Sequence, residues 1–190
     1  MLMCVMVLAL TLLSLPLINF LASDRYVGAV VVVFPLAMGL AIEATSWITE
    51  IGIGISKRSY LSLYGYALFV VATFAGIVFL APVHGLLGLA VAVMIGQIAK
   101  AFLISWLAQR AYPLPWHYAP VVAVFSLTLI IGLVSFEIGQ RWGAGVSTGT
   151  LIAGMIAVLG VGWGILFNAS ERQRVMSHLR QQFSKERLHP

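Results

Sequence analysis

The sequence predicts an all-α integral membrane protein, built as a bundle of six transmembrane helices. Of its 190 residues, 61% are hydrophobic and 9% are charged, whereas soluble domains have about 45–50% and about 25%. The apolar residues form runs of about 20, and a helix of that length spans the ~30 Å hydrocarbon layer of a bilayer. Period-two alternation is absent, and unpaired backbone groups are costly in lipid, so these runs are expected to be helices and not barrel strands.

Each apolar run is separated from the next by a short connection. We expect the first run to be a retained span, because it lacks the basic start of a signal peptide and is too long for one. Pro16 and Pro35 are expected to loosen the first and second helices. The predicted helices cover residues 1–21, 27–50, 61–81, 86–107, 119–138 and 147–167, and together they form one transmembrane domain over residues 1–167.

The fourth run opens with the Pro-x-x-Gly sequence that begins at Pro82. Small residues then recur every three or four positions, which places them along one side of a helix. Membrane helices bring their backbones together through such small residues. The predicted helix-packing residues are Gly85, Gly88, Ala92 and Gly96.

Lys and Arg residues are distributed unequally between the two ends of the predicted bundle. One side carries Lys57, Arg58, Arg110, Arg172, Arg174, Arg180, Lys185 and Arg187, and the other carries Arg25 and Arg141. Because basic residues favour the cytoplasmic side, both termini are predicted to be cytoplasmic. Residues 168–190 form a basic cytoplasmic tail, which is either an amphipathic helix on the membrane surface or a solvated segment.

The second predicted helix carries a polar stripe. Glu43, Ser46 and Glu50 follow an i, i+3, i+7 spacing and share one face. Carboxylates in the middle of a span usually face the bundle interior, so these three residues are candidates for the wall of a substrate or ion cavity. The alternative is that Glu43 pairs with a neighbouring helix and Glu50 lies among the headgroups.

Lys100 is the one basic residue inside a predicted span. It lies about 10 Å from the cytoplasmic end of its helix, a distance that a lysine can largely cover by snorkelling. If it faces inward, it could attract a diphosphate or a sugar acid, or it could pair with Glu43 or Glu50.

Catalytic and cofactor motifs are absent from the sequence. It has no HExxH, no Gly-x-Ser-x-Gly and no phosphate-binding loop, and its single cysteine, Cys4, excludes an internal disulfide or a Cys-based metal cluster. We therefore expect no enzyme activity, cofactor, metal or nucleic-acid partner. The alternatives to transport are a small membrane enzyme acting on lipids or isoprenoids, and a non-transporting membrane assembly subunit.

Four stretches resemble the carboxyl-terminal part of polysaccharide biosynthesis proteins, the lipid-linked oligosaccharide (O-antigen type) flippases of the MATE-like exporter superfamily. They are LINFLASDRYVGA, GIGISKRSY, LAPVHGLLGLAVAVMIGQIAKAFL and QRAYPLPWHY. His84 departs from the aromatic residue frequent at its position in that family. The resemblance covers roughly residues 17–118, and the last two helices match only in topology. The residues that carry it are Tyr26, Gly28, Ala29, Lys57, Arg58, Pro82, Gly85, Gly88 and Ala90.

The resemblance implies a transporter, driven by an ion gradient, that flips lipopolysaccharide-type repeat units across the bacterial cytoplasmic membrane. Its substrate would be an undecaprenyl-diphosphate-linked oligosaccharide. Family members look like two six-helix lobes, sometimes followed by two further helices, so about eight earlier helices would be missing here. A truncated fragment, inactive without those N-terminal helices or another membrane subunit, is the expectation. Glu43, Glu50 and Lys100 are the charges that could hold the anionic substrate.

Overall fold

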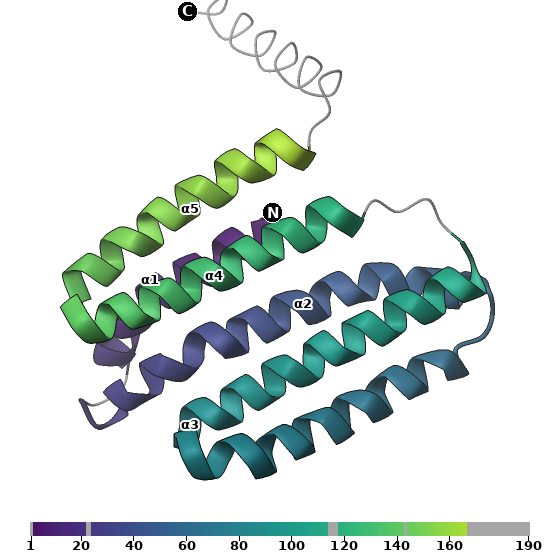
Figure 1. Cartoon of the computed structure of the whole chain (residues 1–190), viewed down its shortest axis with the longest axis horizontal. Coiled ribbons are helices and arrows are strands. Elements are labelled where there is room, and N and C mark those ends of the chain that lie inside the picture. The colour runs from purple at the N-terminus through teal and green to yellow at the C-terminus, as the bar shows by residue number, and fades with distance from the viewer. Residues whose placement is uncertain (1, 22–23, 114–117, 143, 167–190) are drawn as a thin grey trace, which may run out of the picture.

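The computed structural model describes residues 2–21, 24–113, 118–142 and 144–166, and these fold almost entirely into helices. A short 3-10 turn separates the first two α-helices (Figure 1). The predicted tail, residues 168–190, lies outside the described residues. In chain order the elements are α1 (Leu2–Leu21), η1 (Asp24–Ala29), α2 (Val30–Ile55), α3 (Tyr60–Ala111), α4 (Tyr118–Trp142) and α5 (Ala144–Leu166).

Helix α3 is a hairpin of two arms. Its 52 residues would extend about 78 Å as one straight helix, but the chain reverses at Gly85, where φ is 55° and ψ is −128°. Only glycine adopts such angles without strain. Figure 1 shows the arms before and after this residue lying side by side. A Cβ on Gly76 in the first arm would lie 2.8 Å from the Ala92 Cβ in the second, so the two backbones touch.

The described residues therefore contain five α-helices, where the sequence predicts six separate ones. The difference lies at residues 82–85, because the reversal is so tight that helical geometry continues on both sides of Gly85. Helices α1 and α2 also run through Pro16 and Pro35. The second predicted span, 27–50, is found as part of η1 followed by α2, which continues to Ile55.

The end of α2 is fixed by a Schellman motif. The Lys57 N–H donates to the Gly54 carbonyl at 3.0 Å, and the Arg58 N–H donates to the Ile53 carbonyl at 3.4 Å. Lys57 has the left-handed conformation that this motif requires, with φ of 55°. The basic loop thus turns the chain sharply between α2 and the first arm of α3.

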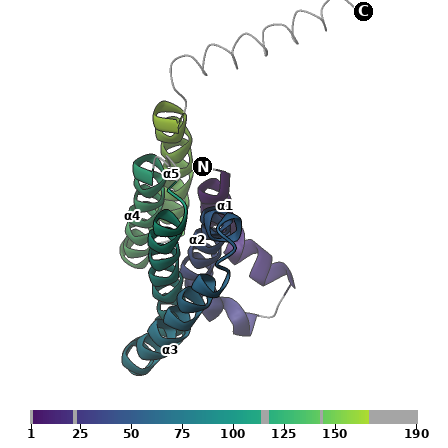
Figure 2. The ribbon, with the colours of Figure 1, turned by 90° about the vertical axis from the view of Figure 1, so that its right-hand side faces the viewer.

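Three clusters of buried side chains hold the bundle together. One joins α1, α4 and α5 around Leu8 and Val158, a second joins α1, α2 and α3 around Met38 and Met94, and a third joins α2 to α3 around Ile53. Helix α1 contributes to both of the first two clusters. In the view along the helices, α1 packs against α5 and α2, and α2 packs against the α3 hairpin (Figure 2).

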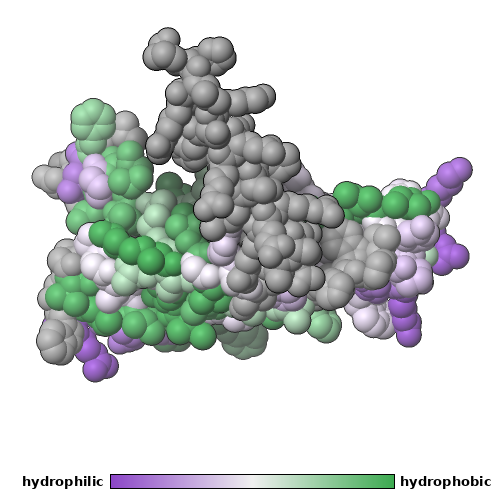
Figure 3. Space-filling model, turned by 90° about the horizontal axis from the view of Figure 1, so that it is seen from above, coloured by the Kyte–Doolittle hydropathy of each residue, from purple (hydrophilic) through white to green (hydrophobic). Residues whose placement is uncertain are grey.

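The outer surface of the bundle is apolar. Phe74, Phe79 and Phe102 are 68%, 74% and 76% exposed. Where described residues are visible in Figure 3, hydrophobic ones cover much of the surface and the most hydrophilic ones lie toward the two ends. Monomeric soluble proteins rarely expose so many large apolar side chains together. All five α-helices are long and apolar enough to cross a membrane, so the fold is compatible with a multi-pass membrane protein.

Candidate functional site

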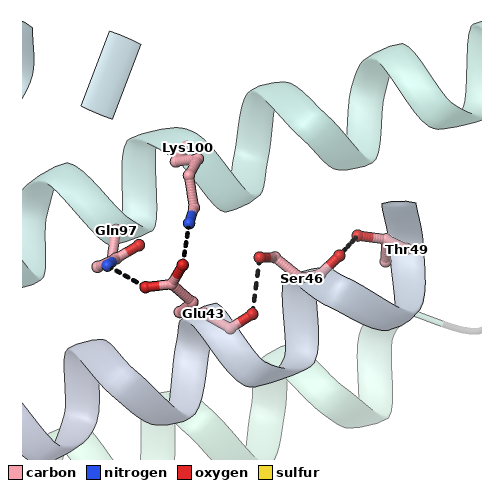
Figure 4. A network of polar contacts seen from close by, with 5 residues as sticks. All are labelled: Glu43, Ser46, Thr49, Gln97 and Lys100. Carbon is pink, nitrogen blue, oxygen red and sulfur yellow. Dashed lines mark hydrogen bonds and ion pairs between the residues drawn. The ribbon is translucent and has the colours of Figure 1, made fainter. Parts of the chain in front are cut away.

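The most deeply buried charge in the described part of the chain is paired. The Lys100 Nζ lies 2.7 Å from the Glu43 Oε1, and the lysine and glutamate side chains are 1% and 23% exposed. The pair joins α2 to the second arm of α3. Lys100 therefore points inward, and of the two partners that the sequence left open its ion pair is made with Glu43 (Figure 4).

Small residues bring the two helices close enough for this contact. Gly39 lies one turn before Glu43, and a Cβ added there would lie 3.5 Å from the Met94 Cα. Ala41, two residues further along α2, is also buried. Because helices approach closely only where side chains are small, this part of α2 places Glu43 within reach of a lysine on α3.

Aromatic rings from the first arm of α3 complete the surroundings of Lys100. Its Nζ lies 4.7 Å from the centroid of the Tyr66 ring and 5.7 Å from that of Phe69. Both distances are within the range of cation–π attraction. Gly65 makes room, because a Cβ there would lie 2.5 Å from Ile104 and 3.6 Å from the Lys100 Cγ. Three helical segments therefore converge on one ammonium.

Gln97 adds a second contact to the same carboxylate. It lies one turn before Lys100, and its Nε2 donates to the Glu43 Oε2. The Gln97 Oε1 is buried and has no hydrogen-bond partner among the described residues, and the same holds for the Glu50 Oε1 and the Thr73 Oγ1. Glu43, Gln97 and Lys100 form a polar centre, and the described part of the chain leaves the Gln97 acceptor in it without a hydrogen bond.

Ser46 of the polar stripe and the neighbouring Thr49 donate hydrogen bonds to their own helix. The Ser46 hydroxyl donates to the Glu43 backbone carbonyl at 2.8 Å, and the Thr49 hydroxyl donates to the Ser46 carbonyl at 2.7 Å. Both side chains are buried. Neither hydroxyl hydrogen-bonds the Glu43 carboxylate in Figure 4, so they make the stripe polar without joining the ion pair.

The structure distinguishes among the predicted packing residues. Gly88, Ala92 and Gly96 all face the first arm of α3: a Cβ on Gly88 would collide with the Leu80 carbonyl, and one on Gly96 with the Thr73 hydroxyl. Gly85 does not pack, since no atom lies within 4 Å of a Cβ placed there. Its spacing fits the stripe, but its positive φ makes it the turn residue instead.

Sequence reasoning missed two members of the centre, Gln97 and Tyr66. Gln97 is three residues before Lys100 and shares its helix face, so the i, i+3 spacing could have revealed it. Tyr66 lies in the other arm, and no local pattern connects it to Lys100. No group of three or more metal-binding side chains occurs in the described ranges.

Comparison with protein-family models, with curated proteins and with solved structures finds no match to this chain.

Proposed function

We propose that this chain is the carboxyl-terminal portion of a transporter that flips lipid-linked polysaccharide repeat units across the bacterial cytoplasmic membrane. In this proposal both arms of α3 cross the bilayer, which makes six crossings and leaves both termini in the cytoplasm. The sequence resemblance described above supports it, and so does the unequal distribution of basic residues. The observation that carries it is the buried Lys100–Glu43 pair.

A structural role alone explains this pair poorly. Replacing a buried ion pair by apolar side chains of similar volume is often neutral or stabilising, by about 1–4 kcal/mol. Ionisable residues inside membrane helices are correspondingly rare and usually mark substrate or ion pathways. A bundle that only needed to hold α2 against α3 could do so with apolar side chains such as those that fill the rest of its core.

The geometry allows exchange of partners at Lys100. The rings of Tyr66 and Phe69 lie beside the Lys100 ammonium, and the lysine side chain is only 1% exposed. The Glu43 side chain, in contrast, is 23% exposed. An anionic diphosphate arriving from the Glu43 side would compete with that carboxylate for Lys100 and could also receive the amide hydrogen bond of Gln97. Glu50, two turns further along α2, would line the same path.

Complementation tests the proposal. The chain is joined to the N-terminal helices of a flippase of this type and expressed in a bacterium that lacks its own flippase, and surface polysaccharide is measured. We expect export to be restored, and to be lost in the Glu43→Gln/Lys100→Met variant. The matched control is Arg141→Met, which removes an exposed charge at the end of α4 that does not line the cavity.

Two outcomes would contradict the proposal. Failure to restore export with a chain that reaches the membrane would remove the flippase assignment. Restored export that persists after loss of Glu43 and Lys100 would contradict only the assignment of these two residues to the substrate path. Stoichiometric co-purification with an unrelated membrane protein would favour an assembly subunit instead.

A further inference from the structure

A second feature of the bundle is a cavity of about 740 Å³ that lies away from the Glu43–Lys100 pair. All five α-helices contribute to its wall, through the second half of α1, the first turns of α2, the start of the second arm of α3, the end of α4 and the start of α5. Its volume is in the range of sites that hold small organic ligands.

The cavity lies near one end of the bundle. Val30 directly follows η1, Leu87 follows the Gly85 turn by two residues, and Gly139 and Ser147 flank the α4–α5 connection. These three connections lie together at one end of the molecule (Figure 1). A ligand here would therefore sit where the hydrocarbon of the bilayer meets the headgroup region.

The sequence explains why side chains do not fill this space. Pro16 and Pro35 both line it, and a proline inside a helix removes one backbone hydrogen bond and pushes its ring against the preceding turn. Helices α4 and α5 contribute the small residues Ser135, Gly139 and Ser147 to the lining. The proline-containing helices α1 and α2 therefore line the cavity together with small side chains of α4 and α5.

The lining is mostly apolar, and two of its polar residues, Ser135 and Ser147, belong to a cluster of hydroxyls between α4 and α5. The other polar lining residues are Thr11, Ser14, Glu137 and Thr148. The Ser135 Oγ lies 3.1 Å from the Ser147 Oγ and 3.2 Å from the Ser147 carbonyl, and the Thr150 hydroxyl lies 3.2 Å from the Ser135 Oγ. These distances are long for O–H···O bonds. The Thr150 hydroxyl also donates to the Ser147 carbonyl at 2.7 Å, so its proton is held. A carbonyl acceptor entering the cavity could therefore take a hydrogen bond from Ser135 or Ser147.

Charge restricts which lipid fits. None of the described residues that line the cavity is Lys or Arg, and one of them is Glu137. The cation beside this lining is Arg141, which lies 3.8 Å from Glu137 and balances its charge, so a diphosphate headgroup would meet one cation and one carboxylate. A zwitterionic glycerophospholipid matches both charges, because its ammonium can pair with Glu137 and its phosphate with Arg141. It also brings uncharged ester carbonyls for the hydroxyls and an acyl chain for the apolar wall.

We propose that this cavity binds one acyl chain of a zwitterionic glycerophospholipid, whose ester carbonyl accepts a hydrogen bond from the Ser135–Ser147 hydroxyl cluster. The lipid fills the space between α1, α2 and α4 and holds the α4–α5 pair against the rest of the bundle. This site is independent of the proposed transport function, since it shares no residue with the Glu43–Lys100 centre.

Photo-crosslinking tests the assignment. The full chain is placed in bilayer discs that contain a trace of phosphatidylethanolamine with a photoactivatable acyl chain, and the labelled peptides are mapped by mass spectrometry. We expect labelling to concentrate on residues 87–94 and 132–139. Val91→Phe, which adds bulk inside the cavity, should lower it about ten-fold, as expected for an overpacked site. Val122→Phe, an exposed position in α4 outside the lining, should not change it.

Competition on the unaltered protein decides the question even if Val91→Phe fails to fold. Excess unlabelled phosphatidylethanolamine should suppress the cavity labelling, and undecaprenyl diphosphate at the same concentration should not. Two results would overturn the proposal: labelling spread evenly over the exposed apolar faces, or stronger suppression by the prenyl diphosphate than by the phospholipid.

Discussion

The Lys100 ammonium has three N–H donors, and its surroundings show why its orientation was open from sequence alone. The Glu43 carboxylate lies at 2.7 Å and the Tyr66 ring at 4.7 Å. Snorkelling would take the same side chain to the interface. Which of the two occurs depends on what neighbouring segments offer, and those segments lie far away in the sequence. The residue pattern identified the charged positions but could not identify the pairing.

Gln97 provides a prediction at the residue scale. Gln97→Leu removes a hydrogen bond to a charged group, a loss of about 1.5–3 kcal/mol, but it also removes a buried carbonyl without a partner, a gain of about 1–3 kcal/mol. The two effects nearly cancel, so we expect the free energy of unfolding in detergent to change by less than about 1 kcal/mol. Gln97→Glu, which places a second carboxylate beside Glu43, should destabilise more. A larger loss in Gln97→Leu than in Gln97→Glu would contradict the described contacts.

At the scale of the element, the α3 hairpin depends on close contact between its arms. A Cβ on Gly96 would collide with the Thr73 hydroxyl and lie 3.0 Å from the Phe69 ring. We expect Gly96→Ala to destabilise the protein by roughly 1–3 kcal/mol, as overpacking does, measured by unfolding in detergent. Gly160→Ala in α5 is the matched control, since no atom lies within 4 Å of a Cβ at Gly160. Equal effects of the two substitutions would argue against tight packing of the arms.

The elements were largely predictable because each is a long apolar run, and such runs must be helical in lipid. The positions of Gly88, Ala92 and Gly96 at the arm contact follow from the same periodicity. Gly85 was misassigned because spacing cannot distinguish a glycine that allows close approach from one that allows a positive φ. The proline-lined cavity also escaped sequence reasoning, since it arises between five helices and not within any one of them.

For the whole molecule, the proposed six crossings give a labelling prediction. In a Cys4→Ser background, single cysteines replace Ser59, His84 and Pro113, which lie before α3, at its turn and after it. If both arms cross the bilayer, positions 59 and 113 should react with a membrane-impermeant reagent from the cytoplasmic side and position 84 from the other. Reaction of positions 59 and 113 from opposite sides would mean that α3 crosses once.

Glu43 and Lys100 depend on each other inside the bundle, and a double-mutant cycle measures this dependence. Free energies of unfolding are measured for the purified chain and for Glu43→Gln, Lys100→Met and the double variant. Lys100→Met alone should cost about 3–5 kcal/mol, because it leaves an uncompensated carboxylate. The double variant should recover part of this loss, with a coupling energy of roughly 1–3 kcal/mol. Additive losses with no coupling would contradict the account.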